Sequence, residues 1–198
     1  MRDGGTLALA DLLAEVRACR LCAASLPLGP RPVLQLDGRA RVLIASQAPG
    51  TKVHATGIPF NDASGDRLRL WLGVSREEFY DPCLFAILPM GMCYPGRGKS
   101  GDLPPRVECA AHWREKLLAQ APNLRLSLAI GQYALRWHFK DDTARTLTDI
   151  VKDWVSHPRL LMALPHPSPR NNLWLRRNPW FEQDLVPLLQ QRVRAALS

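Results

Sequence analysis

The sequence has no apolar stretch near the length that a membrane span requires. A transmembrane helix needs about 20 consecutive apolar residues, and charged residues interrupt the apolar runs of this 198-residue chain well before that length. The amino-terminal stretch has no basic cluster ahead of its apolar part, and Asp11 and Glu15 lie among its apolar residues, which is atypical of a signal peptide. We therefore expect a cytoplasmic protein with no membrane partner.

Acidic residues are scarcer than basic ones. The chain has 18 Asp and Glu against 26 Lys and Arg, a formal net charge of +8. Composition leaves two interpretations open, a charge that serves solubility and a charge that attracts a polyanion such as nucleic acid. The distribution indicates a local positive surface, because residues 159–177 contain no acid and four arginines: Arg159, Arg170, Arg176 and Arg177.

No internal repeat or linker-like stretch divides the chain, so we expect a single domain over residues 1–198. Hydrophobic residues make up 46% of it, which excludes overall disorder. Apolar runs typical of strands alternate with stretches of helical spacing, and this alternation predicts an α/β fold with a parallel sheet and helices on both faces. The expected strands cover residues 41–46, 83–88, 124–130 and 160–164. The expected helices cover 7–18, 66–72, 106–121, 132–139 and 143–156, and two more open at Ser75 and Asn178.

Three unusual segments directly follow expected strands. They are residues 47–50, 89–95 and 166–171, all containing proline and two of them glycine. In a parallel sheet, ligands bind at the carboxyl ends of the strands. The sequence therefore predicts a site where these three segments meet. The glycine- and proline-rich loop over 90–105 is long enough to suggest a function of its own.

Four of the five cysteines form two pairs. Cys19 and Cys22 are three apart, and Cys93 and Cys109 stand at the two ends of the glycine- and proline-rich loop and the start of the next helix. Four thiolates suit zinc or an iron–sulfur cluster, and spacing does not choose between them. Ordinary core cysteines are the alternative. Cys83 is left over on an expected strand, where a buried thiol is typical.

Two of the loops resemble known motifs. Ser46-Gln-Ala-Pro-Gly50, followed by Thr56-Gly-Ile-Pro-Phe60, resembles motif 1 of the uracil-DNA glycosylase superfamily in its family 4 form, and His166-Pro-Ser-Pro-Arg-Asn171 resembles motif 2. The cysteine spacing is similar to that of family 4 as well. The resemblance implies a three-layer sandwich with a central four-stranded parallel sheet flanked by helices. It also implies a 4Fe-4S cluster on Cys19, Cys22, Cys93 and Cys109, with zinc as the alternative.

The resemblance further implies a monofunctional DNA glycosylase. Such an enzyme hydrolyses the N-glycosidic bond of a flipped damaged base, uracil by default, in base excision repair. Phe60 would stack on the base, with an ordinary core phenylalanine as the alternative. His166 would face the base oxygen and stabilise the departing base anion. Gln47 would be a further catalytic residue, and backbone N–H groups around Gln47 and Ala48 would complete the pocket. Ala48, Pro49 and Gly50 would bind the substrate.

The chain departs from the family pattern at four positions. Ala48 replaces the water-orienting Asp of the best-known uracil glycosylases, as it does in family 4, and Gln47 stands where family 4 usually has Glu. His54 replaces an acidic residue and would position or deprotonate water, or else is an exposed loop histidine. Pro89 occupies the place of an Asn that reads the pyrimidine edge. The identity of the excised base is therefore open, with deaminated purines as alternatives to uracil.

DNA contacts are expected from motif 2 and the basic segment after it. Ser168 would bond a phosphate, and Pro169, Arg170 and Asn171 stand where the family wedges a side chain into the gap left by the flipped base. Arg176, Arg177 and Lys99 would contact backbone phosphates. We expect a monomer. The alternatives are a DNA-binding relative without catalysis and a zinc-stabilised hydrolase of a non-nucleic substrate.

Overall fold

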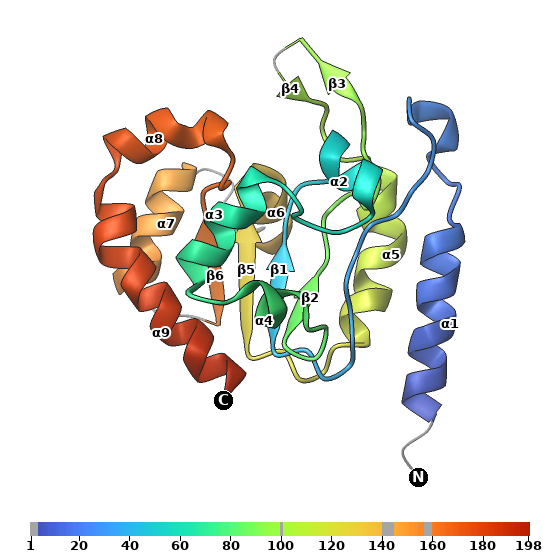
Figure 1. The fold of residues 1–198 in the computed structure, drawn as a ribbon, viewed down its shortest axis with the longest axis horizontal. Coiled ribbons are helices and arrows are strands. Elements are labelled where there is room, and N and C mark those ends of the chain that lie inside the picture. Colours follow the sequence, from blue (N-terminus) through green and yellow to red (C-terminus); the bar gives the residue numbers. More distant parts are fainter. Residues whose placement is uncertain (1–3, 100, 140–144, 157–159) are drawn as a thin grey trace.

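The computed structural model describes residues 4–99, 101–139, 145–156 and 160–198, so Arg159 lies outside it. At its centre is a four-stranded sheet in the order β2-β1-β5-β6, with every neighbouring pair parallel (Figure 1). Each strand is shorter than the predicted run. The strands are β1 (Val42–Ala45), β2 (Phe85–Ile87), β5 (Leu126–Ile130) and β6 (Leu161–Leu164). The predicted α/β fold with a parallel sheet is confirmed.

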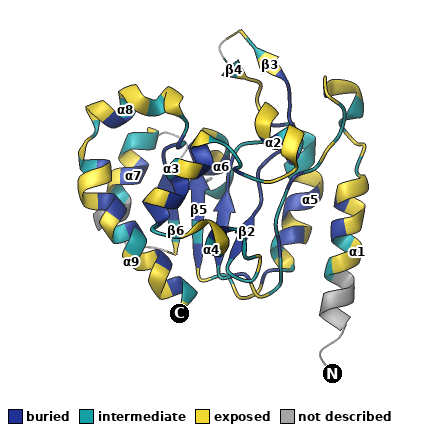
Figure 2. Cartoon of the chain, viewed as in Figure 1, coloured by how far each residue is buried: buried dark blue, intermediate teal, exposed yellow. Residues whose placement is uncertain are grey.

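The strands form the buried centre of the molecule. All residues of β1 and β2 are buried, and Figure 2 shows the sheet in dark blue between helices whose outer sides are exposed. A sheet covered on both faces needs apolar side chains at successive positions rather than at alternate ones. This is why Val42-Leu-Ile-Ala45 reads as a continuous apolar run.

Helices cover both faces of the sheet (Figure 1). The strand order reverses direction after β2, and because crossovers between parallel strands are right-handed, the helices of the next two crossovers, from β2 to β5 and from β5 to β6, lie on the opposite face. On one face lie α3 (Ala63–Leu72), α4 (Arg76–Tyr80) and α9 (Val186–Leu197). On the other lie α5 (Val107–Ala119), α6 (Gly131–His138) and α7 (Leu147–Ser156), with α1 (Gly4–Ala18) beside α5. Residues 143 and 144 of the helix predicted over 143–156 lie outside the described residues.

Several short elements at the carboxyl edge of the sheet were not predicted, because two to six residues carry too little periodicity to be recognised. The loop over 90–105 contains a hairpin that projects beyond this edge (Figure 1). Its strands are β3 (Arg97–Gly98) and β4 (Gly101–Asp102). The other short elements are η1 (Ala23–Ser25), α2 (Thr51–Thr56), η3 (Pro169–Asn171) and α8 (Asn172–Arg177).

The carboxyl-terminal helix changes its winding next to Pro187. A π-helical turn, η4 (Phe181–Leu185), runs directly into α9, and Pro187 stands in the first turn of α9. A helical segment begins just after Asn178, as expected, but the Asn178 side chain does not cap it, because its Oδ1 accepts a hydrogen bond from Nε1 of Trp180 at 3.2 Å instead of one from a backbone N–H.

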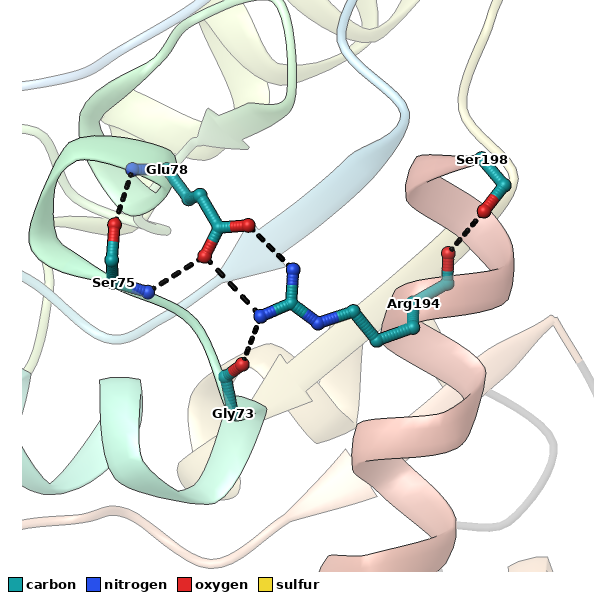
Figure 3. A network of polar contacts seen from close by, with 5 residues as sticks. All are labelled: Gly73, Ser75, Glu78, Arg194 and Ser198. Carbon is teal, nitrogen blue, oxygen red and sulfur yellow. Dashed lines mark hydrogen bonds and ion pairs between the residues drawn. The ribbon is translucent and has the colours of Figure 1, made fainter.

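A polar network joins α4 to α9 (Figure 3). Ser75 and Glu78 form the predicted capping box, in which each side chain accepts from the other residue's backbone N–H. Arg194 of α9 donates to the Glu78 carboxylate and to the backbone carbonyl of Gly73. The network secures the carboxyl-terminal helix against the face that carries α3.

Candidate active site

A cavity of about 460 Å³ opens at the carboxyl edge of the sheet. Its walls come from the motif 1 turn, the segment after β2, the β3–β4 hairpin and the motif 2 loop. Gln47 and His166, 119 positions apart in the sequence (166 − 47), both line it. The three segments that the sequence placed at this edge therefore meet around one hollow.

Backbone hydrogen bonds hold the motif 1 turn against the segment after β2. Met90 N donates to Ser46 O at 2.8 Å, and Gly91 N donates to Gln47 O at 3.0 Å. These bonds continue the parallel pairing of β1 and β2 beyond the strands. Pro89, which has no backbone N–H to donate, is buried and lines the cavity. The wall at this position thus carries no side-chain donor.

Phe60 forms part of the cavity wall in a strained conformation. It is the one non-glycine residue with positive φ in the described part of the chain, at 53°, a conformation that costs about 1 kcal/mol or more. Its ring is only 9% exposed and packs edge-on against Phe79, with centroids 6.1 Å apart. Gly65 makes the turn feasible, since a Cβ there would lie 1.7 Å from the Phe60 carbonyl oxygen. Phe60 is both a core residue and a cavity residue.

Burial favours the neutral form of the His166 imidazole. Burial lowers its pKa from the ordinary 6.5, opposed by the nearby carboxylates of Asp62 and Asp102 and assisted by Arg170. The backbone N–H of Ser168 donates to Nδ1 at 3.2 Å, so the ring proton belongs on Nε2. Asn171 Nδ2 donates to the His166 carbonyl at 2.7 Å and fixes the loop from the other side. A neutral ring with a fixed tautomer is suited to donate from Nε2.

Two acidic residues in the cavity escaped the sequence analysis. Asp62 is half-buried and caps α3, where its Oδ1 accepts from Gly65 N at 3.0 Å. Asp102 is exposed and comes from β4. Both line the cavity, and both act electrostatically on His166. In the sequence, the position of Asp62 two residues after Phe60 could have indicated that it lies in the cavity. An Asp at this position is also typical of an ordinary helix N-cap.

His54 is the catalytic candidate that does not line the cavity. It lies on α2, with its ring centroid 6.2 Å from that of Tyr94, and its Nδ1 is buried without a hydrogen-bond partner among the described residues. A water-activating role for His54 therefore has no support from its position. The other predicted base-site residues all line the cavity: Gln47, Ala48, Pro49, Gly50, Phe60, Pro89 and His166.

The predicted DNA contacts divide into two groups. Ser168, Arg170 and Asn171 line the cavity, and Pro169 lies between them on η3. Arg176 and Arg177 are exposed at the end of α8 and do not line it. The motif 2 loop is thus at the cavity, whereas the later arginines belong to the surface beside it.

The family model described as the Uracil DNA glycosylase superfamily matches residues 35–190. The chain belongs to this superfamily. Its members are mostly N-glycosylases that bind DNA as substrate, so membership suggests DNA glycosylase activity for this chain. The matched region contains both loops that carry Gln47 and His166 and the hairpin between them. None of the described helices is long and apolar enough to cross a membrane.

The four predicted metal-ligating cysteines of this superfamily member line a second, smaller cavity between α1, α5 and the segment after β2. Two sulfurs already accept N–H donors: Cys19 Sγ from Trp113 Nε1 and Cys109 Sγ from Met92 N, both at 3.4 Å. Burial raises the pKa of Cys109 to about 11, and the other three thiols add to the shift. Among the described residues, no three His, Cys, Asp or Glu side chains are arranged to hold a single metal ion. The four cysteines thus line one small cavity, and the sulfurs of two of them accept N–H donors.

Proposed function

We propose that the protein is a monofunctional DNA glycosylase that hydrolyses the N-glycosidic bond of a flipped, damaged base in base excision repair. Uracil is the default substrate. The observation that carries the proposal is the single cavity shared by the Gln47 turn and the His166 loop. Membership of the superfamily supports the reaction class.

The cavity suits a base that has left the duplex. A flipped base needs a stacking surface and groups that bind its edge. Phe60 supplies an aromatic wall, and Gln47 supplies an amide at the end of β1. When the N-glycosidic bond breaks, its electron pair moves onto the base, and the Nε2–H of neutral His166 stabilises the resulting anion without transferring its proton.

Asp62 takes the role of handling water. Since Asp62 Oδ1 is occupied by Gly65 N, Oδ2 is free to accept a hydrogen bond from a water molecule. That water attacks C1′ of the sugar and gives its proton to the carboxylate. The cavity position of Asp62, and the position of His54 outside the cavity, support this assignment. No acidic side chain is then needed at position 48, because Asp62 supplies the carboxylate from the start of α3.

Pro89 bears on which base is excised. A pyrimidine-specific site uses a side-chain amide to read the base edge, and Pro89 supplies none. The polar residues that line the cavity include Ser46, Ser64 and Gln47. We propose uracil as the default and deaminated purines as further substrates.

We also propose that the chain is of the family 4 type, with a 4Fe-4S cluster on Cys19, Cys22, Cys93 and Cys109. Bound by these four cysteines, the cluster would have a structural role and would connect α1, α5 and the hairpin-bearing loop. The protein purified without oxygen should be brown and contain iron and acid-labile sulfide. Cys93→Ser should lose most of the iron, whereas Cys83→Ser should keep it, because Cys83 does not line this cavity. Zinc in place of iron and sulfide would contradict the cluster.

The decisive experiment is an excision assay on labelled single strands that contain uracil, hypoxanthine or xanthine, followed by alkali. We expect strand breaks at uracil and a slower reaction at one or both purines. His166→Ala is the matched control, because a contaminating glycosylase would leave its breaks unchanged. If the protein binds DNA but no strand breaks at any of the three bases, the proposed glycosylase activity is contradicted. The protein would then be a DNA-binding relative without catalysis.

A further inference from the structure

The β3–β4 hairpin and the motif 2 loop meet beside the cavity. The hairpin region contributes Arg97, Asp102 and Leu103 to the lining, and η3 contributes Arg170. Arg170 reaches the hairpin directly, since a Cβ on Gly101 would lie 2.2 Å from its Nη1. Gly101 also has a φ of 144°, a backbone conformation that residues with a side chain rarely adopt. The hairpin, which projects beyond the sheet (Figure 1), is therefore part of the walls of the site.

Unpaired positive charge surrounds the cavity. Lys52 of α2, Arg97 of β3, Lys99 next to it and Arg170 of η3 are all exposed. None of the four forms an ion pair with a described residue, although arginines elsewhere on the surface do, as Arg39 does with Asp37. Two acidic residues, Asp62 and Asp102, line the same cavity. The rim thus has an excess of positive charge without ion-pair partners in the part of the chain that the structure describes.

The position of these cations selects one DNA strand. A nucleotide that swings into the cavity brings its own flanking phosphates to the rim. The complementary strand stays a groove width away, about 6 Å or 12 Å depending on the groove. Cations gathered where the hairpin meets η3 can therefore contact phosphates of the strand that carries the flipped nucleotide.

We propose that the β3–β4 hairpin is a clamp for the strand that carries the flipped nucleotide, with Arg97 and Lys99 binding phosphates beside Arg170. The proposal rests on the proposed function, since it takes damaged DNA as the ligand. It assigns a binding surface to a segment outside both glycosylase motifs. It also makes the complementary strand unnecessary for binding.

The test is a binding measurement with the full-length protein. The probe is a short fluorescein-labelled strand with a tetrahydrofuran abasic analogue, used alone and paired with its complement. The variant is Arg97→Ala/Lys99→Ala. We expect its Kd to rise about tenfold for the single strand and by a similar factor for the duplex. For the single strand, the slope of log Kd against the logarithm of the salt concentration should decrease by about 1.4, the value expected when two phosphate contacts are lost.

Two controls separate the clamp from general charge and from folding. Arg125→Ala/Arg192→Ala removes the same charge from exposed positions at the start of β5 and on α9, and its affinity should match that of the unchanged protein. Arg97→Lys/Lys99→Arg keeps both charges and should retain most of the affinity. Unchanged binding by the alanine pair, or a loss confined to the duplex, would overturn the clamp.

The outcomes also separate this proposal from the proposed function. If the protein excises uracil and the alanine pair binds normally, the enzyme stands and the clamp fails. If no base is excised but binding to the abasic strand depends on Arg97 and Lys99, the clamp stands and the enzyme fails. Neither result can be mistaken for the other.

Discussion

The backbone N–H of Ser168 points at Nδ1 of His166 and donates to it over 3.2 Å. Because two residues of one loop make this contact, the loop sets the tautomer of its own histidine. The prolines on either side of both residues restrict the backbone that brings them together. The neutral ring of His166 therefore reaches the cavity as one tautomer and in one orientation.

His166→Ala should reduce single-turnover excision of uracil by about 100-fold to 1000-fold, the typical loss when one donor to a developing anion is removed. Binding to an abasic strand should change little, because His166 is proposed to act on the base. Excision by rapid quench and binding by anisotropy measure the two effects. An equal loss in both would mean that the histidine holds DNA rather than stabilising the anion.

The stability of the protein should fall as pH falls through 6.5. Burial lowers the pKa of His166 below this ordinary value, despite the opposing carboxylates of Asp62 and Asp102. Just below pH 6.5 the unfolded chain therefore binds the proton more readily than the folded one, and the free energy of unfolding decreases. Urea denaturation on either side of pH 6.5 measures the slope. His166→Gln should show a smaller slope, and an unchanged one would refute the assignment.

Asp62→Asn and Asp62→Ala should separate catalysis from helix capping. Asn is as good an N-cap as Asp, so Asp62→Asn should keep its stability, whereas Asp62→Ala should lose about 1 kcal/mol. Both should lose excision by about 100-fold or more, since neither has a carboxylate. Added formate should restore part of the rate in Asp62→Ala. Full activity in Asp62→Asn would show that the residue serves only as a cap.

Gly65→Ala should damage the cavity through Phe60. The new Cβ would lie 1.7 Å from the Phe60 carbonyl oxygen, so the strained turn must move, at a cost of about 1–3 kcal/mol. Thermal denaturation measures the loss of stability, and excision should fall with it. Gly38→Ala is the matched control, because its nearest neighbour would be at 3.4 Å. Equal stability of the two variants would contradict the tight packing at Phe60.

The parallel sheet was predictable because its strands are covered on both faces and so appear as continuous apolar runs. The turn at Gln47 and the loop at His166 were predictable because proline, with glycine in the first, marks them at strand ends. Asp62 and Asp102 were not, since one resembles a helix cap and the other lies on a strand of two residues. His54 misled for a related reason. It is close to motif 1 in sequence, but α2 carries it to a place outside the cavity.

Hydrophobic pattern and turn residues act between near neighbours in the sequence. They were enough to predict the succession of strands and helices along the chain and the edge of the sheet where ligands bind. Which charged side chains share the cavity depended on contacts between segments that are distant in sequence. Asp62 enters from a helix cap, Asp102 from a projecting hairpin and Arg170 from the last loop. Their meeting depends on packing and on the direction of crossovers between strands, which no local pattern encodes.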